Sequence, residues 1–293
     1  MRGRAFAPGH ITGFFEIADG AREARKKGSR GAGVNLSLGV YTSVEVHAAD
    51  RGSIDISING KSSEAATTRR AVELLAGARR LRVKVDSQVA LPVGQGLGMS
   101  AAGALSTALA LGQALGRPVT HLEAGRAAHV AEIEERTGLG DVAAQLCGGW
   151  EMRVRAGFPP IGQVDRFLVP PQDIAVCVCG RPVSTRSVLT DRDGRKRISA
   201  LGRSCMRRIL AKPTLPNFFE LSFMFAAGTG LAEEGALALA REVGERGLGM
   251  ASVSMIGNSV FAVGQAEGLV KLMRPHGEVF LCRTATCGAG PVV

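Results

Sequence analysis

The stretch LPVGQGLGMSAAG, residues 91–103, places three regularly spaced glycines between a strand-like segment and an alanine-rich one. Gly94, Gly96 and Gly98 let the backbone turn tightly and approach a ligand without interference from a Cβ atom. The helix expected over residues 100–115 would then point its free N–H groups and its dipole at an anion. No Lys-Ser/Thr pair follows the last glycine, so this is not a Walker A loop. The stretch predicts a phosphate-binding turn, with a purely structural connection as the alternative.

The rest of the chain predicts a mixture of strands and helices without a regular βαβ repeat, which indicates an α+β fold. Alternating or continuous apolar residues predict strands at residues 34–46, 54–58, 81–85, 151–155, 166–169, 174–178, 251–256, 259–263 and 279–283. Helical periodicity predicts helices at residues 65–76, 120–136, 200–210, 216–227 and 231–246. A chain of 293 residues is long enough for two cores. We place the boundary near Pro170-Pro171 and expect domains at residues 1–169 and 170–293.

The composition narrows the class of protein and its partners. The net charge of +10 favours anionic partners, and the basic runs are typical of solvated surfaces. Aromatic residues make up only 4% of the chain, which argues against a stacking platform for single-stranded nucleic acid. Six cysteines form no C-x-x-C pair and no zinc-like spacing, and no signal peptide or long apolar segment is present. We therefore expect a cytoplasmic protein with reduced thiols that binds neither nucleic acid nor membrane.

A second stretch, HVAEIEERTGLGDVAAQLCGG at residues 129–149, supplies candidate carboxylates. His129 and Glu132 lie one helical turn apart and share a face. Asp141 follows two glycines at the start of another apolar segment, so helix capping is its simplest role. A solvated acidic helix end is the simplest role for Glu132. Phosphoryl transfer, however, requires one carboxylate at a metal and another near the acceptor hydroxyl, and this stretch contains both.

These stretches resemble the GHMP kinase superfamily. The central motif of that superfamily resembles residues 91–103, its first motif resembles APGHITGFF at residues 7–15, and its third resembles SVSMIGNSVFAVG at residues 252–264. Three departures narrow the match: Met99 replaces the first serine of a usual pair, His10 occupies a commonly basic or polar position, and the third motif lacks its run of glycines. With GSRGAGV at residues 28–34, these features are most similar to the archaeal branch that phosphorylates pantoate.

The resemblance implies a fold and an activity. The fold would be a ribosomal-protein-S5-like N-terminal domain followed by a ferredoxin-like C-terminal domain. The activity would be ATP- and Mg²⁺-dependent phosphorylation of (R)-pantoate to (R)-4-phosphopantoate in coenzyme A biosynthesis, by a possible homodimer. The alternatives are a GHMP kinase for shikimate, homoserine or mevalonate, and a ligand-binding relative without catalysis.

Site roles carry over from the resemblance only onto matching positions. Asp141 corresponds to the catalytic aspartate, and Ser100 and Glu132 to the magnesium and phosphate ligands. The residues that correspond to the nucleotide-binding turn are Pro92, Gly94, Gly96, Leu97, Gly98, Ser100, Ala101 and Ala102.

Pantoate carries a carboxylate and two hydroxyls, so its pocket needs a cation and polar groups. Arg30 and Arg153 are the candidates for the carboxylate, since a guanidinium binds it in a bidentate manner. Ser29, His129 and Thr185 are the candidates for the hydroxyls. The alternatives are that Arg30 belongs to a basic surface run, that Arg153 forms a salt bridge on its strand and that His129 supports a neighbouring carboxylate.

Overall fold

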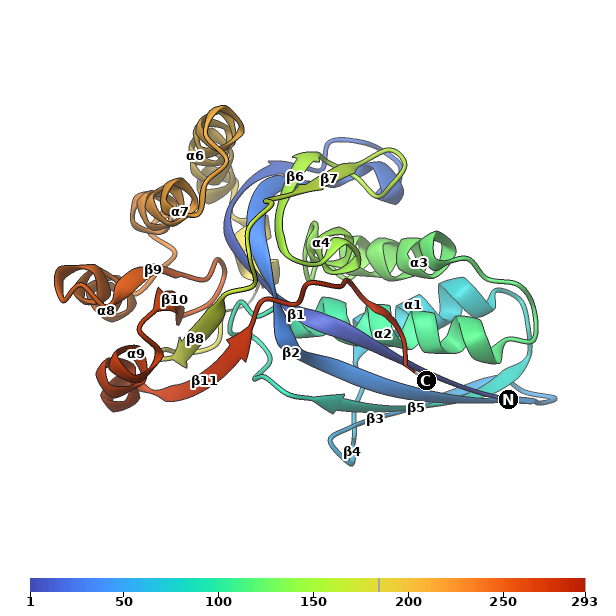
Figure 1. Cartoon of the computed structure of the whole chain (residues 1–293). Coiled ribbons are helices and arrows are strands. Elements are labelled where there is room, and N and C mark those ends of the chain that lie inside the picture. Colours follow the sequence, from blue (N-terminus) through green and yellow to red (C-terminus); the bar gives the residue numbers. More distant parts are fainter. Residues whose placement is uncertain (184, 293) are drawn as a thin grey trace.

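Two β-sheets with helices packed against them make up the computed structural model, which describes residues 1–183 and 185–292 (Figure 1). The first sheet has the order β12-β1-β2-β5-β3-β4, with β6 paired to β2 and β7 paired to β6. Its strands are β1 (Arg2–Ala18), β2 (Gly28–Ala48), β3 (Ser53–Ile58), β4 (Lys61–Ser62), β5 (Leu81–Val89), β6 (Trp150–Arg155), β7 (Gln163–Arg166) and β12 (Gly290–Pro291). A 3-10 turn, η1 (Ala24–Lys26), lies between β1 and β2.

The hairpin of β1 and β2 is the longest feature of the first sheet. Its antiparallel register runs from Arg2 opposite Glu45 to Ala18 opposite Gly28, with irregularities at Pro8/Gly9 and after Thr12. One end of the hairpin pairs with β5, and the other end curves upward and pairs with β6 (Figure 1). This bend lets β1 contact helices of both lobes.

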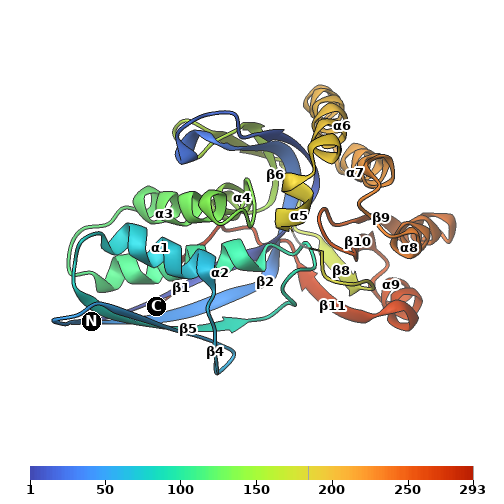
Figure 2. The same ribbon diagram turned by 180° about the vertical axis from the view of Figure 1, so that it is seen from behind.

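Four helices cover one face of the first sheet, as Figure 2 shows from behind. They are α1 (Ala66–Ala76), α2 (Met99–Ala114), α3 (His121–Glu134) and α4 (Asp141–Cys147). Small side chains such as Ala104 and Ala108 are fully buried along α2. An alanine-rich helix can lie between a sheet and other helices because its side chains leave room for close packing. This position fixes the start of α2, directly after the glycine-rich turn.

The second sheet has the order β11-β8-β10-β9 and is antiparallel throughout. Its strands are β8 (Asp173–Val178), β9 (Gly249–Val253), β10 (Ser259–Gly264) and β11 (Glu278–Arg283). Its helices are α5 (Thr185–Thr190), α6 (Arg192–Ala211), α7 (Leu215–Thr229), α8 (Glu234–Glu245) and α9 (Ala266–Met273), with a 3-10 turn η2 (Arg274–His276). The strand order 4-1-3-2 is that of a ferredoxin-like sheet, so the predicted α+β class and two-lobed architecture are confirmed.

The change of sheet falls between β7 and β8, close to Pro170-Pro171. This position supports the predicted division at residues 169/170, which remains a proposal. The chain also returns to the first sheet at its end, because β12 pairs with β1. No helix within the described residues is long and apolar enough to cross a membrane.

The sequence did not predict β1, the first residues of β2, or the short helices α5 and α9, and for α4 it indicated only a start near Asp141. Residues 7–10 and 12–15 include Pro8, Gly9 and Gly13 and are almost continuously buried, so no two-residue alternation marks this part of β1. Helix α6 begins at Arg192, eight residues before its predicted start, since Asp191 caps it by accepting from the backbone N–H groups of Asp193 and Gly194. The strand predicted at residues 166–169 ends at Arg166.

Candidate active site

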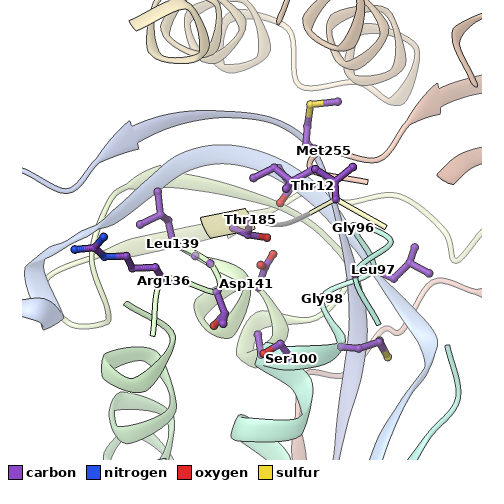
Figure 3. Close-up of a pocket in the computed structure, with 18 of the residues that line it drawn as sticks. Thr12, Gly96, Leu97, Gly98, Ser100, Arg136, Leu139, Asp141, Thr185 and Met255 are labelled. Carbon is purple, nitrogen blue, oxygen red and sulfur yellow. The ribbon is translucent and has the colours of Figure 1, made fainter. Parts of the chain in front are cut away.

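A cavity of about 490 Å³ lies where the two lobes meet. Figure 3 shows Ser100 and Asp141 on one side of it, with Thr12 and Met255 on the other. The contributing segments are β1, β2, the start of α1, the glycine-rich turn, the loop before α4, the segment around α5 and the loop after β9. Its lining residues are Thr12, Phe15, Ser29, Ala66, Val93, Gly94, Gly96, Leu97, Gly98, Met99, Ser100, Ala101, Glu135, Arg136, Thr137, Gly138, Leu139, Gly140, Asp141, Val183, Thr185, Met255 and Ile256.

The glycine-rich turn requires glycine for its conformation. Gly94, Gly96 and Gly98 have φ angles of 82°, 71° and 67°, in the left-handed region that other residues rarely adopt. A Cβ atom on Gly96 would also lie 2.7 Å from the Ser254 hydroxyl oxygen, so the turn packs tightly against the second lobe. Of the residues predicted for this turn, Pro92 and Ala102 do not line the cavity, whereas the others do.

Two helices begin at the cavity. Ser100 lies in the first turn of α2, and its hydroxyl donates to Thr67 Oγ1 at 3.3 Å. Asp141 is the first residue of α4, and Gly140, which has no side chain, is the N-cap residue. Asp141 is therefore not the N-cap residue, and the capping role considered for it is wrong. Its side chain is 27% exposed, and both helix starts present N–H groups and a positive dipole end near the cavity.

Glu132 lies directly behind this surface. Among the described residues, no group meets strict hydrogen-bond geometry with either of its buried carboxylate oxygens, although the backbone N–H groups of Asp141 and Val142 lie close enough to favour its charged form. A Cβ atom on Gly138 would lie 2.3 Å from Glu132 Oε1 and 3.0 Å from Asp141 Oδ2, so the two carboxylates approach the same point. Burial, together with the charge of Asp141, raises the pKa of Glu132 well above its usual value. A buried carboxylate whose charge is only weakly satisfied, beside a second carboxylate, suits a bound cation.

A metal at this point would depend on ligands from outside the protein. Across residues 1–183 and 185–292, no group of three or more His, Cys, Asp or Glu side chains could hold a metal ion. Magnesium characteristically binds one or two carboxylates and completes its octahedron with phosphate oxygens and water. The Ser100 hydroxyl, which lines the cavity, and the Glu132 carboxylate, which does not line it, are of the chemical type that fits magnesium arriving with a nucleotide.

His129 is a neutral, buried histidine. Its Nε2 lies 3.1 Å from the Lys27 carbonyl oxygen, and its Nδ1 lies 3.8 Å from Glu132 Oε2. Burial lowers the pKa of His129 to about 4, which keeps the ring uncharged at neutral pH. It does not line the cavity, and its position beside Glu132 matches the alternative that it supports this carboxylate.

Both arginines predicted for the acceptor carboxylate have protein partners. Arg30 Nη1 lies 3.1 Å from Glu16 Oε2, and its Nε donates to the Val154 carbonyl oxygen. Arg153 is 2% exposed and donates from Nη1 to Glu151 Oε1 and from Nη2 to Thr12 Oγ1. Neither arginine lines the cavity, although Thr12, which Arg153 contacts, does. Their role as acceptor ligands remains a prediction.

Ser29 and Thr185 line the cavity, so the structure brings these two candidates to the same cavity as Asp141. A residue that the sequence analysis missed is Arg136, the basic side chain among the described lining residues. It has a φ of 56°, and Figure 3 places it at the end of the cavity away from Gly96. The Thr-Gly-Leu-Gly sequence that follows it was the available sign that the chain leaves its helix there.

The sequence analysis also missed the partner of Asp141, which is His10. This fully buried ring places Nδ1 2.7 Å from Asp141 Oδ1 and Nε2 3.0 Å from Glu151 Oε1. Burial lowers the pKa of His10, but the hydrogen bonds and charges of Asp141 and Glu151 outweigh this effect and raise it. Burial likewise raises the pKa of Asp141, but His10 and the charge of Arg153 outweigh it and lower it. Asp141 is therefore ionised at neutral pH.

Comparison with known proteins identifies the family. The model of the GHMP kinases N terminal domain matches residues 65–149. The chain is 40% identical to pantoate kinase of Thermococcus kodakarensis over 270 residues, which covers 90% of this chain and 88% of that protein. It is 33% identical to pantoate kinase of Methanocaldococcus jannaschii over 268 residues, which covers 90% of this chain and 93% of that protein.

Solved structures give the same result. A phosphotransferase related to the coenzyme A biosynthesis pathway is 34% identical, superposes with a TM-score of 0.89 and covers 100% of this chain and 99% of its own. Mevalonate diphosphate decarboxylase from Staphylococcus aureus is 13% identical with a TM-score of 0.74 and covers 98% of its own chain, which shows the shared fold alone. Similarity of this extent over nearly the whole chain shows that the protein belongs to the GHMP kinase superfamily and, within it, to the pantoate kinase family.

Proposed function

We propose that this protein transfers the γ-phosphoryl group of ATP to the hydroxyl of (R)-pantoate and forms (R)-4-phosphopantoate for coenzyme A biosynthesis. One observation carries the proposal: the starts of α2 and α4, with Ser100 and Asp141, meet at one cavity beside the glycine-rich turn. The acceptor is taken from the pantoate kinases that this chain resembles. Because both of these relatives are archaeal proteins, we assign the reaction to coenzyme A biosynthesis as it occurs in archaea.

The phosphates would bind at the glycine-rich turn and at the start of α2. The three left-handed glycines line the cavity, where a backbone without Cβ atoms can approach the phosphates, and the helix dipole favours negative charge at Ser100. Because phosphoryl transfer proceeds through a loose transition state, positioning and electrostatic stabilisation account for most of the catalysis. The rigid packing of this turn against Ser254 therefore serves the reaction directly.

Asp141 would orient the acceptor hydroxyl and accept its proton. Oδ1 is engaged by His10, so Oδ2 is the oxygen available to the substrate. Since the pKa of Asp141 is lowered, the carboxylate acts more as an orienting acceptor than as a strong base. Magnesium, when bound, neutralises phosphate charge, and Glu132 and Ser100 are the residues that would hold it.

The acceptor would lie between Asp141 and the residues opposite it. Ser29 and Thr185 supply hydroxyl groups at the cavity surface. Three further residues remain proposed acceptor ligands: His129, Arg30 and Arg153. Each already forms a hydrogen bond within the protein, which it would have to give up in order to contact the acceptor directly. An Arg153→Ala variant tests this role, because loss of a carboxylate contact raises the KM for the acceptor selectively.

We also propose a cytoplasmic location and a homodimer. All six cysteines lie within the described residues and are free thiols, which suits a reducing compartment. The homodimer rests on the family resemblance alone, and light scattering of the purified protein tests it directly.

The experiment that tests the function is an acceptor screen. Purified protein is mixed with ATP, MgCl₂ and one of four alcohols (pantoate, shikimate, homoserine or mevalonate), and ADP release is measured against a control without acceptor. We expect acceptor-dependent ADP with pantoate alone and a product heavier by one phosphoryl group. Turnover with another alcohol instead would reassign the acceptor. ATP binding without turnover on any acceptor would favour a ligand-binding protein.

A further inference from the structure

Four charged side chains form a row that leads away from the cavity behind Asp141. His10 lies between Asp141 and Glu151, at 2.7 Å and 3.0 Å, and Glu151 accepts in turn from Arg153. The side chains of His10 and Glu151 are fully buried and that of Arg153 is 3% exposed, whereas Asp141 reaches the cavity. Neither His10 nor Glu151 lines the cavity.

The shorter contacts of the row favour a protonated His10, because Nε2 lies 3.0 Å from Glu151 Oε1 but 3.5 Å from Arg153 Nη1. Ionised carboxylates accept hydrogen bonds and donate none, so both ring nitrogens of His10 must carry a hydrogen. The row then contains two anions and two cations. A neutral His10 would leave one negative charge unbalanced in the interior, which is energetically costly.

His10 also connects Asp141 to the phosphate-binding turn. Its backbone N–H donates to the carbonyl oxygen of Leu97 at 3.0 Å, and its side chain donates to Asp141. Asp141 is the first residue of α4 and not its N-cap, and the bond from His10 holds Oδ1 of its carboxylate. The orientation of His10 is in turn determined at Nε2 by Glu151.

We propose that Glu151, acting through His10, is a positioning residue for phosphoryl transfer: it holds the imidazole so that Oδ2 of Asp141 faces the acceptor hydroxyl. This inference rests on the proposed function of Asp141. Since neither Glu151 nor His10 lines the cavity, we expect both to act on turnover and not on binding.

The first test is a double-mutant cycle between Glu151 and Asp141. Glu151→Gln keeps the side-chain volume and removes the charge, and we expect kcat to fall about 10- to 100-fold with both KM values within about threefold of wild type. In an Asp141→Asn background the same change should have little further effect, since Glu151 acts through Asp141. Glu123→Gln, which removes the remote ion pair with Arg117, is the matched control and should leave kcat unchanged.

The second test distinguishes the two sides of the imidazole. The amide nitrogen of an asparagine at position 10 replaces Nδ1, which faces Asp141, whereas that of a glutamine replaces Nε2, which faces Glu151. We expect His10→Asn to retain more turnover than His10→Gln, because only the former keeps the donor to Asp141. This comparison holds even if Glu151→Gln does not fold.

Three outcomes would overturn the inference. The first is an unchanged kcat in Glu151→Gln, and the second is that Glu151→Gln lowers kcat by the same factor in the wild-type and the Asp141→Asn backgrounds. The third is greater turnover in His10→Gln than in His10→Asn. Failure of the proposed function gives a different result. In that case Asp141→Asn itself turns over at the wild-type rate, or no acceptor yields ADP.

Discussion

Asp141 and Glu132 are two neighbouring carboxylates with opposite environments. Asp141 is 27% exposed, receives a bond from His10 and has a lowered pKa, so it is charged at the cavity. Glu132 is 1% exposed and has a raised pKa, chiefly because of its burial and the charge of Asp141. A pair of carboxylates whose pKa values are driven apart is typical of sites that divide two chemical tasks between them. This supports substrate activation by Asp141 and cation binding by Glu132.

Replacing Asp141 with asparagine should therefore affect chemistry more than nucleotide binding. We expect Asp141→Asn to lower kcat by about 10²- to 10⁴-fold, since an amide cannot accept the hydroxyl proton. The dissociation constant of a non-hydrolysable ATP analogue, measured by calorimetry, should change less than about threefold, because the phosphates bind at the turn and not at Asp141. Ser100→Ala is the converse control and should weaken nucleotide binding in the presence of magnesium. Wild-type turnover in Asp141→Asn would remove the proposed role.

The charge of His10 predicts a pH dependence of stability. Its pKa in the folded protein is raised above the usual 6.5, so protonation favours the folded state. That contribution is fully present below the unfolded-state value and is lost as the pH rises through the folded-state pKa. Urea unfolding of wild type and His10→Gln should show a larger difference in the free energy of unfolding at pH 6 than at pH 9. A difference that increased with pH would mean that the ring is neutral in the fold.

The sequence was sufficient to locate Ser100 and Asp141, because each lies within a short contiguous stretch whose glycines and helix start can be recognised locally. It was not sufficient to find the role of His10, whose partners Asp141 and Glu151 lie 131 and 141 residues away. Glu151 and Arg153 are two residues apart on a predicted strand and so share a face. The sequence analysis considered a salt bridge for Arg153 on its strand, but it named neither Glu151 as the partner nor the histidine beside it.

At the scale of elements, the glycine-rich turn depends on both its conformation and its neighbours. Gly98 has a φ of 67°, and a Cβ atom there would lie 3.0 Å from the Gln145 side chain and from the His10 carbonyl oxygen. Gly103 lies in the interior of α2, where the nearest atom to an added Cβ, Thr68 Oγ1, is at 3.5 Å. The backbone conformation at Gly98 therefore requires glycine, whereas the position of Gly103 has room for a side chain.

This contrast gives a matched pair of alanine variants. We expect Gly98→Ala to destabilise the protein by about 1–2 kcal/mol, since the left-handed conformation is costly for alanine. It should also raise the KM for ATP, because the turn carries the phosphates. Gly103→Ala should instead stabilise it by about 0.5–1 kcal/mol, since alanine is the better helix former. Chemical denaturation and steady-state kinetics measure both. Equal effects of the two variants on the KM would show that the turn does not bind the nucleotide.

The missed strand β1 shows why periodicity fails at this element. A strand with one face in solvent alternates, but β1 lies between the helices of the first lobe and α6 and α7 of the second. Phe14 and Phe15 are consecutive and both buried. Strands covered on both faces are continuous apolar runs that sequence pattern alone does not separate from other buried segments. The helices α2 and α3 were predictable because composition and an N-cap at Thr120 mark them locally.

At the scale of the whole molecule, aromatic side chains join the two lobes. Trp150 of β6 packs at 5.4 Å and 5.8 Å, between ring centroids, from Phe218 and Phe219 of α7. Phe218 also contacts Phe14 of β1, and both α7 rings lie against Phe261 of β10. Outside this cluster, Arg195 of α6 forms an ion pair with Asp19 at the end of the β1–β2 hairpin. The cavity depends on this association, since its walls come from both lobes.

The same cluster predicts how the protein unfolds. Trp150 is the only tryptophan in the sequence and is 1% exposed, so its fluorescence reports on the junction of the lobes. If the lobes share one core, tryptophan fluorescence and far-ultraviolet circular dichroism should follow a single, coincident urea transition. Phe218→Ala should lower the free energy of unfolding by about 3–5 kcal/mol, as expected for a buried phenylalanine. Phe223→Ala, on the half-buried side of the same helix, should cost less. A fluorescence change that preceded the loss of helix would show instead that the lobes separate before either unfolds, and catalysis would then require their docking as a distinct step.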